Sequence, residues 1–216
     1  MASAEKLFGI NNYLRFAIAP EKFADAIQGE QTLWVTNMEG FGIACGPKAI
    51  ALASWERCTL PRSAMAPERS HIRGTWDFFA RTLTPRAIKL DFPEGATDEQ
   101  IATFLEAHSP DASVKPGDPE IQSWITLMDQ SGEILAVGAI VKWQSGELCL
   151  ASIATHTVQR GNGLATSLVT KMVERCEELG AKRVGLGVYA ENFAAKRVYT
   201  KCGFTLMNEF TSYSRD

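Results

Sequence analysis

Apolar residues in the C-terminal half of the chain first follow the spacing of strands. They alternate or run continuously over residues 121–128, 134–143 and 147–155, which predicts three strands. The connections at 129–132 and 144–146 are short, polar and contain glycine, so we expect the strands to pair as an antiparallel meander. The middle strand is apolar on both faces, which indicates a central position covered on both sides.

The apolar period then changes to that of a helix. A stripe over 164–179 predicts an amphipathic helix that ends at Gly180, a residue type common just after a helix. Asn192 is a suitable N-cap for a second helix, whose apolar stripe runs over 195–202 and ends at Gly203.

Between these helices Val184, Leu186 and Val188 alternate with two glycines, which predicts a strand with one nearly bare face. Either a helix or a ligand could approach the backbone there. A last strand is expected over 204–210. The order of these elements predicts an α+β fold with a mixed central sheet, in which the meander leads into a right-handed β-α-β crossover and helices flank the sheet.

The first half of the chain has a less regular pattern. A polar, proline-rich connection over 109–120 separates it from the second half. Thr97 and Gln100 form a capping-box pattern that predicts the start of a helix. The other elements expected here are helices over 20–28 and around Trp76, Phe79 and Ala80, and strands over 33–36, 41–44, 49–54 and 86–92.

Composition excludes several classes of protein. The 216 residues carry a formal net charge of −3 with both signs interspersed, so no nucleic-acid partner is expected. The five cysteines are scattered and the three histidines lie far apart, so we expect reduced thiols and no metal site. The longest apolar run, 134–141, is too short to span a membrane, and the chain begins without a signal-peptide pattern. A cytoplasmic protein with no membrane partner is therefore expected.

The segment 158–165 carries the clearest chemistry in the sequence. It contains Gly161 and Gly163, follows an apolar run over 148–154, and leads into the helix that begins near Leu164. Two glycines flanking one residue let the backbone turn with its N–H groups exposed, and the helix start adds unpaired amides and the positive end of its dipole. Such a turn binds phosphate or pyrophosphate. No lysine followed by serine or threonine comes after the second glycine, which excludes a Walker-type loop.

Two separate motifs resemble the GNAT N-acetyltransferase superfamily. One is the glycine-rich turn over 160–165, which is similar to the family's cofactor motif. The preceding segment, 153–156, also resembles a subgroup of the family, although Thr157 stands where the family usually has proline. The second motif lies around the last helix, where Asn192, Ala195, Tyr199, Gly203 and Phe204 match the family's spacing. Together the resemblance covers about residues 120–211.

The resemblance implies a GNAT-type fold and transfer of an acetyl or other short acyl group from acyl-CoA to a primary amine. Acetyl-CoA would be the cosubstrate, a small-molecule amine the acceptor, and assembly as a homodimer is left open. By the same resemblance, Tyr199 would protonate the departing CoA thiolate. The expected cofactor-binding residues are Ile153, Ala154, Thr155, Arg160, Gly161, Asn162, Gly163, Leu164, Ala165, Thr166, Asn192 and Ala195.

The general base is the gap in this hypothesis. Glu147 and His156 stand at the two ends of the strand that precedes the glycine-rich turn, and a structural role is favoured for His156. A water relay, or a carboxylate from the first half such as Asp77 or Asp91, is an equal alternative. Two cations of the last helix could reach the coenzyme phosphates or stay solvated, namely Lys196 and Arg197.

The role of the first half is also an expectation. We expect an N-terminal α/β region, 1–115, to pack on the GNAT domain, 116–216, and to contribute to the acceptor site, because the family domain needs little more than the second half. The alternative is a separate domain with its own partner. Two rival functions remain: an acyl-CoA-binding or sensor module without turnover, against which the retained Tyr199 argues, and a protein lysine or N-terminal acetyltransferase.

Overall fold

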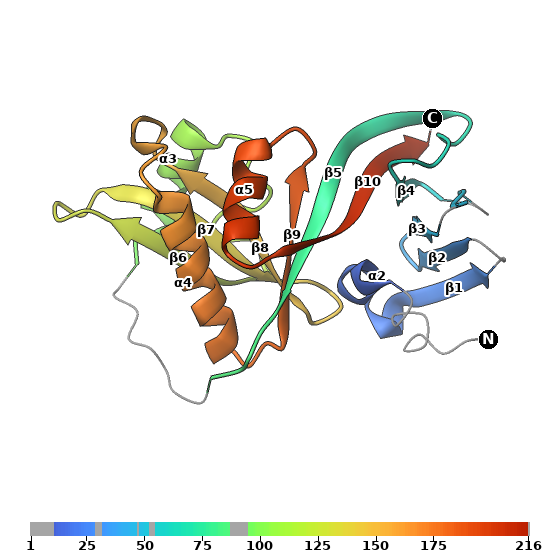
Figure 1. Cartoon of the computed structure of the whole chain (residues 1–216), viewed down its shortest axis with the longest axis horizontal. Coiled ribbons are helices and arrows are strands. Elements are labelled where there is room, and N and C mark those ends of the chain that lie inside the picture. Colours follow the sequence, from blue (N-terminus) through green and yellow to red (C-terminus); the bar gives the residue numbers. More distant parts are fainter. Residues whose placement is uncertain (1–10, 29–31, 47, 52–54, 87–94, 216) are drawn as a thin grey trace.

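The computed structural model describes residues 11–28, 32–46, 48–51, 55–86 and 95–215, and these form ten strands in a single sheet. The strands are β1 (Phe23–Gln28), β2 (Leu33–Asn37), β3 (Phe41–Cys45), β4 (Arg57–Pro61), β5 (Ser70–Thr82), β6 (Ile121–Met128), β7 (Ile134–Lys142), β8 (Leu148–Thr155), β9 (Arg183–Tyr189) and β10 (Thr205–Arg215). Across the sheet they follow the order β1-β2-β3-β4-β10-β5-β9-β8-β7-β6 (Figure 1).

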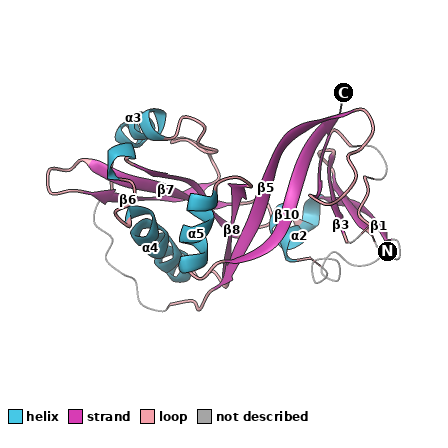
Figure 2. Cartoon of the chain, turned by 45° about the horizontal axis from the view of Figure 1, so that its top comes forward, coloured by secondary structure: helices cyan, strands magenta, loops and turns pink. Residues whose placement is uncertain are grey.

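Helices cover both faces of this sheet (Figure 2). The α-helices are α2 (Asn12–Ala17), α3 (Asp98–His108), α4 (Leu164–Glu178) and α5 (Phe193–Lys201), and two short 3₁₀ turns are η1 (Pro20–Lys22) and η2 (Thr157–Gln159). Helices α4 and α5 share one apolar layer with Ile140 of β7, whereas α2 packs on the opposite face with Ala139 and Val141. Helix α3 packs against Val137 on that second face. None of the described helices is both long and apolar enough to cross a membrane.

The second half of the chain confirms the predicted α+β fold. Strands β6, β7 and β8 form an antiparallel meander, and β9 pairs parallel to β8 after the crossover through α4. Both predicted helices and the strand between them are present, and the last strand extends beyond the expected residue 210 to Arg215. The capping box before α3 is also confirmed, since Thr97 and Gln100 exchange side-chain to backbone hydrogen bonds.

The helix predicted around Trp76, Phe79 and Ala80 is wrong, because these residues belong to strand β5. The segment is instead a 13-residue strand that pairs with β10 on one side and β9 on the other. Phe78 packs in the layer that contains α2, and the adjacent Phe79 packs in the layer that contains α4. Both faces of the strand are therefore apolar, and this pattern imitates the stripe of a helix.

Other expectations for the first half have mixed outcomes. The strands expected over 33–36 and 41–44 are confirmed. The helix expected over 20–28 is wrong, because the chain makes the 3₁₀ turn η1 and then strand β1. Residues 49–51 are not in a strand, and residues 52–54 and 87–92 lie outside the described part of the chain. Helix α2 and strand β4 were not predicted.

Aromatic rings occupy the bare face of β9. A Cβ atom on Gly185 would lie 2.6 Å from the ring of Phe78 and 2.9 Å from that of Phe16. At Gly187 the nearest atom would be a ring carbon of Trp76, at 3.5 Å. The absence of a side chain at Gly185 thus lets two rings, one from β5 and one from α2, pack directly on the strand backbone.

We expect Gly185→Ala to lower the free energy of unfolding by about 1–3 kcal/mol, because neither ring can move without disturbing the core. Gly187→Ala is the matched control on the same strand, since its new methyl group would make only an ordinary contact with Trp76. We expect a change within about 0.5 kcal/mol for that control. Urea-induced unfolding of the two variants measures both quantities, and equal losses would contradict the packing argument.

Candidate active site

Strands β8 and β9 diverge at the centre of the sheet. Their parallel pairing begins at Leu148 with Val184 and ends at Leu150 with Leu186. Beyond these residues the two strands are not paired with each other. The later part of β8 continues to pair with β7, through Ala154 and Thr155. The divergence therefore leaves the backbone edge of β8 that faces β9 without a strand partner, and a ligand can pair with that edge.

A cleft of about 620 Å³, here called the cofactor cleft, lies beside this divergence. It is bounded by the end of β8, the glycine-rich turn, the start of α4 and one face of α5. Eleven of the twelve residues expected to bind the cofactor line it: Ile153, Ala154, Thr155, Arg160, Gly161, Gly163, Leu164, Ala165, Thr166, Asn192 and Ala195. Asn162 does not line the cleft, and its side-chain amide donates to Gln159 Oε1 at 3.2 Å.

The glycine-rich turn presents free backbone amides to the cleft. Gly161 and Gly163 have φ values of +88° and +80°, and a Cβ at either position would meet no atom within 4 Å. The first backbone hydrogen bond across the helix start is the one that Ser167 donates to the Gly163 carbonyl. Among the described residues, the amides of 161–166 have no acceptor. Five of these six residues line the cofactor cleft, and unpaired amides just before and at the start of a 15-residue helix fit the pyrophosphate of a coenzyme.

Tyr199 is a buried residue in the lining of the cofactor cleft. It lies on α5, where Asn192 caps the helix by accepting a hydrogen bond from the Ala195 amide at 3.1 Å. Its ring is 7% exposed and packs near Phe79 and Phe204. Burial, with a smaller contribution from the nearby Cys202 thiol, raises the pKa of Tyr199 to about 12. The phenol is therefore protonated at neutral pH and can donate a proton.

A second hollow of about 270 Å³, here called the inter-strand cavity, opens between the diverging strands. Four residues line both this cavity and the cofactor cleft, so the two spaces meet at Ser109, Ile153, Asn192 and Tyr199. The remaining walls come from β5, β8, β9 and the turn after α3. These residues are Trp76, Asp111, Ala112, Ser113, Ala151, Ser152, Gly187, Val188 and Tyr189.

None of the general-base candidates named from the sequence, Glu147, His156 and Asp77, lines either space. Glu147 forms an ion pair with Arg183 at 3.4 Å and lines a different cavity, at the other end of β8. Asp77 is buried and forms ion pairs with Arg62 and Lys196, so its charge is already balanced. Asp91 lies outside the described residues.

His156 belongs to a cluster beside the cofactor cleft. Its ring lies 4.3 Å from that of His108, centroid to centroid, and its Nδ1 atom is buried without a partner in the described structure. His108 accepts a hydrogen bond from the Thr157 amide at 3.4 Å, and its carbonyl accepts one from Arg160 at 3.3 Å. The pKa of His108 is lowered by partial desolvation and, to a smaller extent, by the charges of the nearby His156 and Arg160. The cluster thus ties the end of α3 to the glycine-rich turn.

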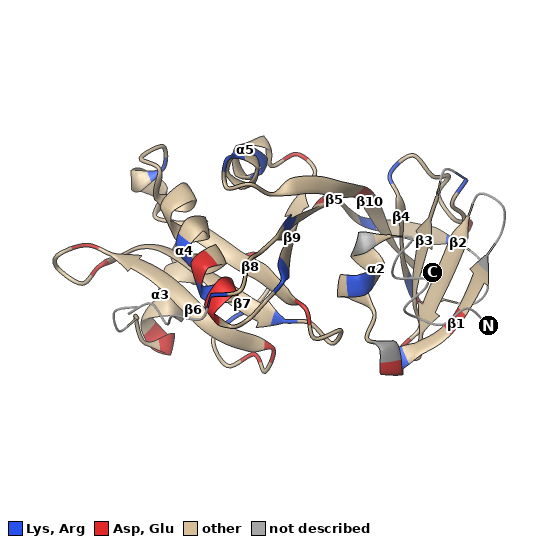
Figure 3. Ribbon diagram, turned by 60° about the horizontal axis from the view of Figure 1, so that its bottom comes forward, with Lys and Arg blue, Asp and Glu red and all other residues tan. Residues whose placement is uncertain are grey.

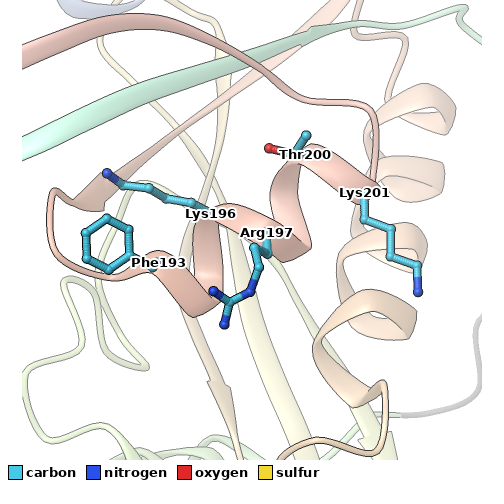
Figure 4. A pocket seen from close by; sticks show the side chains of 5 residues that line it. All are labelled: Phe193, Lys196, Arg197, Thr200 and Lys201. Carbon is cyan, nitrogen blue, oxygen red and sulfur yellow. The ribbon is translucent and has the colours of Figure 1, made fainter.

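Helix α5 carries cationic residues, and part of its ribbon is blue in Figure 3. Lys196 is held by its ion pair with Asp77 and a hydrogen bond to the Ala190 carbonyl. Figure 4 shows Lys196 beside Phe193, with Arg197 and Lys201 further along the helix. Only Lys201 of these cations also lines the cofactor cleft, where it can meet a coenzyme phosphate. Lys201 and His108 also line the cofactor cleft but were not predicted from the sequence.

Comparison with known proteins agrees with this geometry. Residues 86–204 match the family model described as the acetyltransferase (GNAT) family, whose members use acetyl-CoA. An uncharacterized N-acetyltransferase of Mycobacterium bovis is 26% identical over 121 residues, which cover 56% of this chain and 78% of the relative. An uncharacterized N-acetyltransferase of Bacillus subtilis is 37% identical over 62 residues, or 29% of this chain and 40% of that relative.

Solved structures show the same fold at low sequence identity. A GNAT-family protein of Novosphingobium aromaticivorans superposes with a TM-score of 0.54 at 15% identity, over 99% of this chain and 97% of the other. A GCN5-related N-acetyltransferase of Kribbella flavida gives a TM-score of 0.53 at 15% identity, over 88% and 89% of the two chains. With the family model matching more than half of its length, the chain belongs to the GNAT acetyltransferase family.

Proposed function

We propose that this protein transfers an acetyl or other short acyl group from acyl-CoA to a primary amine by direct attack. The observation that carries the proposal is the position of Tyr199, which lines both the cofactor cleft and the inter-strand cavity. A thioester entering from the first space and an amine entering from the second would meet beside its hydroxyl.

The cofactor cleft supplies binding and polarisation. The amides of 161–166 would hold the pyrophosphate, and Lys201 would add a positive charge to the same cleft. The free backbone edge of β8 at 153–155 would hydrogen-bond the pantetheine. One amide of that edge, aimed at the thioester oxygen, would stabilise the developing oxyanion by ~3 kcal/mol.

The chemical step balances as a direct transfer. The amine nitrogen attacks the thioester carbonyl carbon, the C–N bond forms and the C–S bond breaks. The departing sulfur takes the proton of the Tyr199 hydroxyl, and the nitrogen loses one proton to water in the open cavity. Burial raises the pKa of Tyr199, but burial also raises the pKa of thiols in this protein, as at Cys149 and Cys202. A thiolate released in the same dry space is likewise a stronger base than in water, which offsets part of the rise in the pKa of the phenol.

We also propose that the first half of the chain completes the acceptor site. Trp76 of β5 and residues 109–113 after α3 line the inter-strand cavity. Strand β10, at the end of the chain, pairs with both β4 and β5. These contacts support packing of the N-terminal region, 1–115, on the domain over 116–216.

The decisive assay is thiol release from acetyl-CoA in the presence of a panel of primary amines, with a lysine-containing peptide included. We expect release that depends on both acetyl-CoA and a small amine. Release only with the peptide would instead favour a protein acetyltransferase. Tight CoA binding by calorimetry without release from any acceptor would favour the acyl-CoA-binding module.

A further inference from the structure

The inter-strand cavity contains one ionised side chain among its described lining residues. That side chain is Asp111, in the turn that follows α3. The rest of the described lining is neutral, so Asp111 is the charged group that an acceptor would meet there. An acceptor with a carboxylate or phosphate would find no cation in the cavity wall, whereas a second ammonium group would find a partner.

The turn that carries Asp111 is anchored to the sheet. The Ser152 hydroxyl accepts a hydrogen bond from the Val114 amide at 2.9 Å and donates one to the Val114 carbonyl at 2.8 Å. Ser152 has a φ of +49°, a backbone conformation that few side chains adopt. Val114 itself is buried in the apolar layer that contains α2. The segment 109–114 is therefore held over the cavity by a fixed point three residues from Asp111.

Two aromatic rings stand near each other at the same cavity. Trp76 and Tyr189 are directly paired residues on the adjacent strands β5 and β9. The Trp76 indole is fixed because its Nε1 donates to Ser212 Oγ at 2.8 Å. Tyr189 is 60% exposed although it lies in the centre of the sheet. Aromatic faces at an open site attract alkylammonium groups and cover their methylene chains.

Exposed and buried side chains together line the cavity. Asp111 lies on an exposed turn, whereas Tyr199 is 7% exposed and faces the cofactor cleft. We propose that the preferred acceptor is a diamine-type molecule, with a primary amine that reacts beside Tyr199 and a second cationic group that binds Asp111. Trp76 and Tyr189 cover the alkyl chain that joins the two groups. This inference rests on the proposed function and names its substrate class.

The test compares α,ω-diamines with n-alkylamines of the same chain length. In the wild type, kcat/KM is expected to be about 10-fold or more higher for the best diamine, as for one charge-assisted contact. Asp111→Asn, which keeps the shape and removes the charge, is expected to abolish most of that preference. The matched control is Glu106→Gln, an exposed carboxylate of α3 that lines neither space and should retain the preference.

The outcomes separate this inference from the proposed function. Turnover without a diamine preference, or a preference that survives in Asp111→Asn, overturns the inference and leaves the acyltransferase intact. Absence of thiol release with every amine overturns the proposed function. In that case the role of Asp111 is tested by binding alone, with 1,4-diaminobutane titrated into the protein–CoA complex in a calorimeter. Binding that weakens about 10-fold in Asp111→Asn supports it, and equal binding by both proteins refutes it.

Discussion

Replacing Tyr199 with phenylalanine is expected to lower the turnover number with acetyl-CoA by about 10²–10⁴, while CoA affinity stays nearly unchanged. The substitution keeps the ring that packs near Phe79 and Phe204 and removes only the hydroxyl. Stopped-flow thiol release under single-turnover conditions measures the chemical step directly. The loss should shrink with acyl donors whose leaving thiol has a lower pKa, because such thiolates need less protonation.

The control for this substitution is Tyr213→Phe. Tyr213 is also buried, but it packs between Trp34 and Leu60 in the other half of the sheet. The Tyr213→Phe variant should therefore keep the wild-type turnover number. Because the pKa of Tyr199 is about 12, the phenol remains protonated through pH 10, so its ionisation should not reduce activity between pH 7 and 10. Wild-type turnover in the Tyr199 variant, with chemistry rate-limiting, would remove this hydroxyl from the mechanism.

Strands that pair with their neighbours along the chain were predicted from local pattern alone. Strands β6, β7 and β8 are joined by short turns, and each pairs with the next, so the period of each segment and its turn residues were sufficient. The glycine-rich turn is similarly local, because Gly161, Gly163 and the first amides of α4 lie within six residues. Local chemistry of this kind can be read from the sequence without knowing the topology.

Strand β5 shows why the first half was harder. Its partner β10 lies more than a hundred residues away in sequence, and its other partner, β9, is nearly as far. Apolar layers on both faces of the sheet require Phe78 and Phe79 to be apolar together, so the alternation that marks a half-buried strand is lost. The spacing of Trp76, Phe79 and Ala80 then matches a helix as well as a strand.

The residues on the acceptor side of the candidate site could not be predicted for the same reason. Asp111 lies in a connection whose composition indicated only a linker, and Trp76 lies on the strand that was expected to be a helix. The sheet order brings these residues to Tyr199, and no local pattern contains that information. The carboxylate in the proline-rich segment is evident in the sequence, but only the topology shows that this segment lines the inter-strand cavity.

The glycine-rich turn supports the second large prediction. Valine at Gly161 or Gly163 is expected to weaken CoA binding by about 10²-fold or more, which corresponds to the loss of two charge-assisted hydrogen bonds of about 1.5 kcal/mol each. The positive φ at each glycine disfavours a β-branched residue, so the turn must change shape and its amides lose their common direction. The new side chain would also enter the open space where the pyrophosphate is expected. Isothermal titration calorimetry with CoA measures the loss.

Gly180→Val separates lost binding from lost stability. Gly180 follows the other end of α4, with a φ of +79° and no atom within 4 Å of a Cβ position, so valine there imposes a closely similar backbone strain. Its position at the C-terminal end of the helix excludes it from the cofactor cleft. We therefore expect comparable decreases in the free energy of unfolding for all three variants, but wild-type CoA affinity only for Gly180→Val. If both turn variants also bound CoA with wild-type affinity, the amides of 161–166 would not be the pyrophosphate site.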